Sequence, residues 1–440
     1  MTIEKKTAVE LAGLLAAGQT TAAGLAEACL RHADEAGGFV TTSAEAALRT
    51  AGRVDARRGA GEALPPLAGV PVGVEDSFCT EGVLTACGSA MLKGFIPPYS
   101  ATAVTRLEAG GLPLLGKLAV GEFGLEPDGP CGAVLAVAQG ALPLALGSDH
   151  DGALRRRAGD AGLVSLKPTW GAISRYGLVS AASSLDQAAP VARSVMDCAL
   201  LFDLLAGPDP LDASTCQAPH SPVAPSLDGE VGHLHIALVR ELQEAAGPAS
   251  AAALSAAEAL VVLGATCREA ALPLAALGPR THYILASAEA SSNLARLDGI
   301  KYGHRAQEAE GIGDLIAKSR AEGFGPELRR RTLLGTYALL TAYRAEYYDR
   351  AVRLRAALVA ACDELLADCD LLLTPLRPAA GYGEALDREG LCTVLANLAG
   401  LPALVLPFGG GALQLIGKRG SEALLLNAAL ALESLERRGS

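Results

Sequence analysis

The spacing of hydrophobic residues changes between two periods along the chain. In residues 65–76, Val70, Val72 and Val74 alternate with other residues, which predicts a short strand that ends in the acidic pair Glu75-Asp76. Residues 7–32 instead show helical spacing, and the pair Thr20-Thr21 can cap the second half of this stretch. The chain is therefore expected to begin with two amphipathic helices that lead into a sheet.

The same two periods recur to the end of the chain. Helices are predicted at 102–110, 133–139, 194–206, 246–264, 391–400 and 421–437, and 283–370 reads as mostly helical. Strands are predicted at 112–115, 163–166, 173–178, 233–239, 371–374, 403–407 and 412–416. A further buried strand is predicted after a break at Gly140, and it ends at Gly147-Ser148-Asp149. This alternation predicts an α/β fold with a mixed central β-sheet covered by helices on both faces.

We expect one domain over residues 1–440. Within it, 1–62 forms an N-terminal helical segment, 63–207 a core, and 208–440 the rest of the sheet with a helical region, after a polar linker at 208–228.

Composition narrows the functional class. Hydrophobic residues make up 50% of the 440 residues and charged residues 19%, which is typical of a compact globular protein. The net charge of -11 argues against direct nucleic-acid binding, because phosphate recognition requires clustered Lys and Arg. A chain of this kind could still take part in RNA chemistry if a partner subunit held the RNA.

Several classes of site lack a sequence signal. The ten cysteines are scattered with no C-x-x-C pair, so neither a zinc site nor a disulfide framework is expected. No glycine-rich nucleotide loop is present, and we expect no cofactor. The N-terminal sequence lacks the apolar region of a signal peptide and no long apolar span is evident, so a cytoplasmic protein without a membrane segment is expected.

Four stretches of the chain form specific motifs: LALGSD at 144–149, KPTWGAISRYGL at 167–178, SSLDQ at 183–187 and SSNLARLDGIKYGHR at 291–305. These motifs resemble the amidase-signature family, and within it the A subunits of tRNA-dependent amidotransferases. The resemblance covers nearly the whole chain and implies the amidase-signature fold. It also implies possible B and C amidotransferase subunits as partners.

The resemblance further implies a Ser–Ser–Lys relay, in which a Lys acts as base, a Ser in a cis peptide passes the proton and a second Ser attacks the amide. All three positions differ here. Glu75 stands where the family has the Lys, Gly129 where it has the bridging Ser, and Ala153 where it has the nucleophile. A stretch that usually precedes the bridging Ser is also missing between Phe123 and Gly129.

Other residues near these positions make up a candidate ligand pocket: Ser148, Asp149, His150, Arg155, Tyr302 and Arg305. Asp149-His150-Asp151 is not expected to bind a metal, because alternate side chains diverge in an extended chain. The run Arg155-Arg156-Arg157 could hold an anion or form internal ion pairs. Gly390 falls where the family has an Asp that holds the glutamine amino group.

Two hypotheses follow. In the first, the chain is a catalytically inactive scaffold or ligand-binding pseudoenzyme. In the second, it is an active amidase or glutaminase subunit of Glu-tRNA(Gln)/Asp-tRNA(Asn) amidotransferase that uses displaced residues such as Glu75. A gene product with no remaining role is a third hypothesis, which the retained motifs disfavour.

Overall fold

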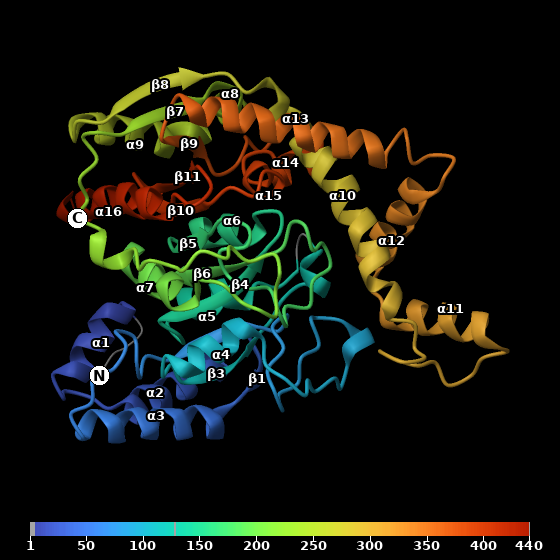
Figure 1. The fold of residues 1–440 in the computed structure, drawn as a ribbon, viewed down its shortest axis with the longest axis horizontal. Helices are drawn as coiled ribbons and strands as arrows, with labels where there is room; N and C mark the ends of the chain where they lie inside the picture. Colours follow the sequence, from blue (N-terminus) through green and yellow to red (C-terminus); the bar gives the residue numbers. More distant parts are fainter. Residues whose placement is uncertain (1–4, 127–128, 440) are drawn as a thin grey trace.

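The computed structural model describes residues 5–126 and 129–439 (Figure 1). Its strands form one 11-stranded sheet in the order β1-β3-β2-β4-β6-β5-β10-β11-β9-β7-β8. The strands are β1 Phe39–Thr42, β2 Val72–Glu75, β3 Leu114–Leu118, β4 Leu144–Asp149, β5 Val164–Lys167, β6 Gln187–Ala192, β7 His235–Val239, β8 Thr266–Ala270, β9 Leu371–Pro375, β10 Ala403–Phe408 and β11 Gly411–Gly417.

The helices alternate with these strands along the chain. They are α1 Ala8–Ala16, α2 Ala22–Ala36, α3 Ala44–Gly59, α4 Thr102–Ala109, α5 Gly132–Ala138, α6 Ala153–Asp160, α7 Val195–Leu205, α8 Arg240–Ala246, α9 Ala251–Val262, α10 Gly278–Asn293, α11 Ile312–Gly323, α12 Pro326–Leu339, α13 Tyr348–Ala367, α14 Ala385–Gly390, α15 Val394–Leu398 and α16 Glu422–Gly439.

The sheet is mixed, as the alternation of elements predicts. Strand β2 runs parallel to both β3 and β4, and β7 runs parallel to β8 and β9, whereas β4, β6, β5, β10, β11 and β9 pair antiparallel in turn. Because β2 and β4 are parallel neighbours, their carboxyl ends lie at the same edge of the sheet. This edge carries the candidate site.

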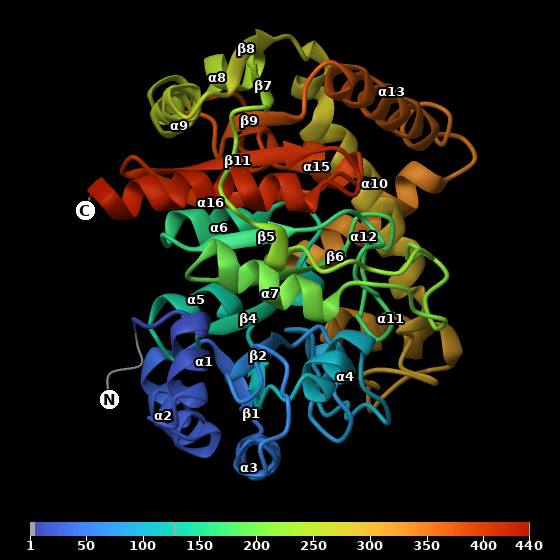
Figure 2. The ribbon, with the colours of Figure 1, turned by 60° about the vertical axis from the view of Figure 1, so that its left-hand side comes forward.

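Helices cover both faces of the sheet (Figures 1 and 2). Leu404 and Leu406 of β10 belong to the same buried cluster as Leu425 of α16. Between those two leucines, Val405 points to the opposite face, where it lies under Gly159 of α6. The predicted α/β architecture with a covered central sheet is thus confirmed.

The two predicted N-terminal helices are α1 and α2. Thr7 caps α1 in a capping box with Glu10, and the hydroxyl of Thr21 accepts the N–H of Gly24 at the start of α2. The predicted cap therefore lies at the second residue of the pair Thr20-Thr21.

Helices α10 to α13 form an arm beside the sheet (Figure 1). Phe324, just after α11, packs in a buried cluster with Met91 and Phe123 from the first part of the chain. The buried carboxylate of Glu122 adds a polar connection, since it accepts the hydroxyl of Ser89 at 2.5 Å and the N–H of Gly325 at 2.8 Å. The arm is thereby held close to the loop that follows β3.

One predicted strand needs correction. The predicted strand at 173–178 is wrong: Ile173 and Leu178 make only isolated bridges, because the backbone turns at the left-handed glycines Gly171 and Gly177.

The stretch Arg240–Val262 is long and apolar enough to span a membrane by length and composition. In the fold it is divided into α8, a short turn and α9, and α9 packs on β9 and β11.

Candidate functional site

The three positions that differ from the family's relay meet around one small cavity. Glu75 ends β2, Ala153 begins α6, and Gly129 lies in the loop after β3, and all three line a cavity of about 40 Å³. Ser148, His150 and Asp151 line the same cavity. The cavity therefore has space for no more than a few atoms.

Glu75 is buried and hydrogen-bonded to the neighbouring strand. Its Oε2 accepts both the backbone N–H of Ser148, at 2.7 Å, and the Ser148 hydroxyl, at 2.8 Å. Burial raises the pKa of Glu75 to about 7, although the Ser148 hydrogen bonds act in the opposite direction. The group is thus poised to exchange a proton near neutral pH, but it cannot carry the positive charge of a lysine.

The turn before α6 is filled by carboxylates. The N–H of Ala153 donates to Asp151 Oδ1 at 2.7 Å, and the N–H of Gly152 donates to Asp149 Oδ1 at 2.9 Å. Burial alone would raise the pKa of Asp151, but Arg156, followed by His150 and His282, holds it below its usual range. Asp151 is therefore an anion where a helix N-terminus could otherwise stabilise a developing oxyanion.

Gly129 has no room for a side chain in this loop conformation. A Cβ atom on Gly129 would lie 2.6 Å from the Cα of Gly121 and 3.0 Å from Oε2 of Glu126. The two residues just before Gly129, Pro127 and Asp128, lie outside the described residues. The bridging serine of the family could not occupy position 129 without movement of the loop.

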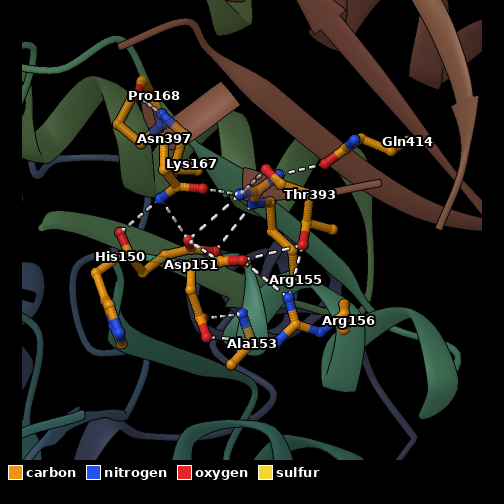
Figure 3. A network of polar contacts seen from close by, with 12 residues as sticks. His150, Asp151, Ala153, Arg155, Arg156, Lys167, Pro168, Thr393, Asn397 and Gln414 are labelled. Atoms are coloured by element: carbon orange, nitrogen blue, oxygen red, sulfur yellow. Dashed lines mark hydrogen bonds and ion pairs between the residues drawn. The ribbon is translucent and has the colours of Figure 1, made fainter. Parts of the chain in front are cut away.

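A buried polar network lies directly behind the cavity (Figure 3). The guanidinium of Arg155 contacts Asp149 at 2.9 Å and Asn397 at 2.5 Å, and it also donates to Gln414. Burial would raise the pKa of Asp149, yet Arg155 holds it below its ordinary value. Arg155 and Asp149 are fully buried partners in this network rather than groups open to a ligand.

Arg156 ties the turn to the segment before α15. Its Nη1 donates to the carbonyl of Asp151 at 2.8 Å and to the Thr393 hydroxyl at 2.6 Å. Of the two interpretations of the arginine run, internal pairing thus describes Arg155 and Arg156. Arg157 lies on the cavity wall.

Two candidate pocket residues lie elsewhere. Arg305 lines a separate cavity of about 420 Å³ with Ile300 and Ile312, beside α11, and Tyr302 is 62% exposed. Gly390 ends α14, where a Cβ would meet Val394 at 2.8 Å. Of the six candidate pocket residues, Ser148 and His150 line the cavity at the former relay, with Asp149 and Arg155 in the network behind it.

Several residues at the site have no signal in the sequence. His282 on α10 contacts the carbonyl of His150 at 2.9 Å through Nε2, and burial, with His150 as the second cause, lowers its pKa to about 3. Cys131 lines the cavity, but burial raises the pKa of its thiol to about 12, so it remains protonated. Within residues 5–126 and 129–439, no cluster of three His, Cys, Asp or Glu could hold a metal ion.

Comparison with known proteins defines the family. The Amidase family model matches residues 25–131 and 129–426. The A subunit of glutamyl-tRNA(Gln) amidotransferase from Moorella thermoacetica is 43% identical to this chain in sequence. The match covers 90% of this chain and 88% of the relative. Its counterpart from Chloroflexus aggregans is 41% identical, over 94% of this chain and 92% of the relative.

Solved structures show the same relationship. The A subunit of glutamyl-tRNA(Gln) amidotransferase from Thermotoga maritima superposes on this chain with a TM-score of 0.76 at 27% sequence identity. The superposition covers 98% of this chain and 95% of the Thermotoga maritima chain. A protein described in connection with a vestigial complex and the origins of an s-triazine catabolic enzyme has a TM-score of 0.84 at 29% identity, with 98% of both chains covered. The chain therefore belongs to the amidase-signature family.

Proposed function

We propose that this chain is an A-type subunit of an amidotransferase assembly in which the family's serine relay does not operate. The relatives from Moorella thermoacetica and Chloroflexus aggregans support the assembly, because the similarity extends over most of both chains. The site supports the second part, because the positions of base, relay and nucleophile are occupied by Glu75, Gly129 and Ala153.

One observation carries this proposal. Ala153 lies at the first residue of α6, where the nucleophile of the family would stand, and its N–H is already bonded to the Asp151 carboxylate at 2.7 Å. A methyl group cannot attack an amide, and an anion beside the turn disfavours a second negative charge. The role that remains is to bind a ligand or to hold partner subunits.

The partners that fit this role are B- and C-type amidotransferase subunits, and the location that fits is the cytoplasm. A partner would supply any contact with RNA, because the net charge of this chain is -11.

A second candidate is an active amidase that uses displaced groups. Its support is the hydrogen bond of 2.8 Å between the Ser148 hydroxyl and Glu75, since a carboxyl group with a pKa of about 7 can accept a proton from a nucleophile. Against it stand the N–H groups of Gly152 and Ala153, which already bind carboxylates and so cannot stabilise an oxyanion.

Co-expression tests the assembly. The chain would be produced together with the B- and C-type subunits of its native host, and the mixture would be separated by gel filtration with light scattering. We expect a stoichiometric complex. A chain that elutes alone at micromolar concentration, while both partners are folded, would remove the proposal of an A-type subunit.

A further inference from the structure

Helix α12 in the arm carries apolar side chains on two opposite faces (Figure 1). Its inner face packs on α10, so closely that a Cβ atom on Gly335 would collide with the carbonyl oxygen of Ser287. Its outer face presents Leu333, Tyr337 and Leu340, which are 73%, 37% and 48% exposed. Spacings of four and three residues place these three side chains in one line along the helix.

A tyrosine from the segment after α12 extends this line. The ring of Tyr343 stacks on the ring of Tyr337 with a centroid distance of 4.3 Å, and Tyr343 is itself 37% exposed. Leu333, Tyr337, Leu340 and Tyr343 therefore form one surface, which we call the α12 patch. A contiguous apolar and aromatic surface of this kind marks an interaction site on a soluble protein.

Arginines surround the α12 patch. Residues 326–353 contain six arginines and three acidic residues, a local charge of +3 within a chain of net charge -11. Five of these arginines are exposed: Arg329, Arg330, Arg344, Arg350 and Arg353. Arg330 and Arg344 are paired within the chain, and the other three make no ion pair in the part of the chain that the structure describes. Arg329 lies one turn before Leu333 and so continues the line of the patch.

We propose that the α12 patch docks an acidic segment of a partner subunit that also carries apolar side chains. Apolar side chains of this segment would cover Leu333 and Leu340, and its carboxylates would pair with the arginines that have no partner within the chain. The inference rests on the proposed function, because the amidotransferase assembly supplies the partner.

Two other occupants fit the surface less well. Single-stranded nucleic acid stacks its bases on exposed ring faces, but Tyr343 already covers one face of Tyr337, and leucines take up the rest of the line. A second copy of this chain, related by a two-fold axis at the patch, would bring like-charged arginines together. An acidic protein segment satisfies both the apolar line and its basic surroundings.

Hydrogen exchange tests the location of the interface. The chain would be compared by mass spectrometry when free and when bound to the B- and C-type subunits of its native host. We expect slower exchange over residues 329–353 in the complex, because a docked segment would shield this surface and stabilise the arm.

Affinity measurements on variants test the chemistry of the surface. Leu333→Asp should weaken binding of the partner subunits by about tenfold or more, because it places a charge in the apolar line. Arg329→Glu should weaken binding and reduce its dependence on salt concentration. Val262→Asp is the matched control, because Val262 is 84% exposed on α9, on the other side of the molecule (Figure 1). It should bind like the wild type, and circular dichroism checks that all three variants are folded.

The outcomes separate this inference from the proposed function. A complex that leaves 329–353 unprotected, or that forms equally well with Leu333→Asp, would overturn the inference and leave the A-type subunit in place. A chain that forms no complex would overturn both. An oligouridylate that binds the chain alone, and no longer binds Leu333→Asp, would assign the surface to nucleic acid and overturn the inference.

Discussion

Asp151 Oδ1 accepts the backbone N–H of Ala153 at 2.7 Å, so a carboxylate of the chain itself caps the first turn of α6. A helix N-terminus attracts anions through its unpaired N–H groups and its dipole. In this protein the attraction is satisfied internally, and the Arg156–Thr393 hydrogen bond of 2.6 Å holds the same turn from the other side. The turn is thus a fixed part of the fold instead of a binding site for an oxyanion.

Replacement of Arg155 should be strongly destabilising. Arg155→Ala would leave Asp149 charged and buried with its main partner removed, which costs about 3–5 kcal/mol of unfolding free energy. Urea unfolding followed by circular dichroism measures the loss. The control is Arg49→Ala, since Arg49 pairs with Glu45 on the exposed surface of α3 and should contribute at most about 1 kcal/mol. Similar costs for the two variants would refute the buried network as a source of stability.

The unfolding free energy should depend on pH through Glu75. The pKa is raised from 4.5 in the unfolded chain to about 7 in the fold, so the unfolded chain loses its proton first as pH rises. The stabilising contribution is therefore complete below pH 4.5 and is lost as pH rises to about 7.

Glu75→Gln removes this dependence and keeps an oxygen that can accept the Ser148 hydrogen bonds. Relative to this variant, the wild type should lose up to about 3 kcal/mol between pH 4.5 and pH 7. Chemical denaturation across that range measures the difference. Parallel curves for the two proteins would show that the carboxyl group titrates normally.

A pair of glycine substitutions separates crowding from backbone strain. Gly152 and Gly18 both have left-handed backbones, with φ of +87° and +66°. A Cβ on Gly152 would lie 2.3 Å from the Cβ of Thr393, whereas Gly18 has no heavy atom within 4 Å.

Gly18→Ala should therefore cost about 1 kcal/mol for strain alone, and Gly152→Ala should cost more because the turn before α6 must also move. Thermal unfolding of both variants gives the comparison. If Gly152→Ala is no more harmful than Gly18→Ala, the turn is not packed against Thr393 as described.

Much of the fold could be predicted, because periodicity and caps act locally. Thr21 caps α2, and the alternating valines before Glu75 form β2. The sequence did not reveal β6, whose six residues, Gln187–Ala192, contain three alanines and Pro190. Proline is unusual in a central strand, yet β6 pairs with both β4 and β5, and Pro190 lies opposite Leu146. Tertiary pairing outweighs local propensity there.

The candidate site could be predicted only in part. The motif around Gly147 and Ser148 aligned Ala153 with the nucleophile position, and the structure places Ala153 in one cavity with Glu75 and Gly129. The roles of Asn397 and Gln414 could not be foreseen, because each lies more than two hundred residues from Arg155 in the chain. Resemblance to the family predicts Arg305 in the pocket, but in the structure Arg305 lines a separate cavity near α11.

The most direct test of the central claim is ammonia release from glutamine by the purified chain with its partner subunits. Asparagine and simple amides would be tested in parallel. The account predicts release no faster than the buffer control, for the wild type and for Ser148→Ala and Glu75→Gln alike. Turnover by the wild type that disappears in Ser148→Ala and Glu75→Gln, while both variants remain folded, would contradict it and establish the Ser148–Glu75 pair as a working catalytic centre.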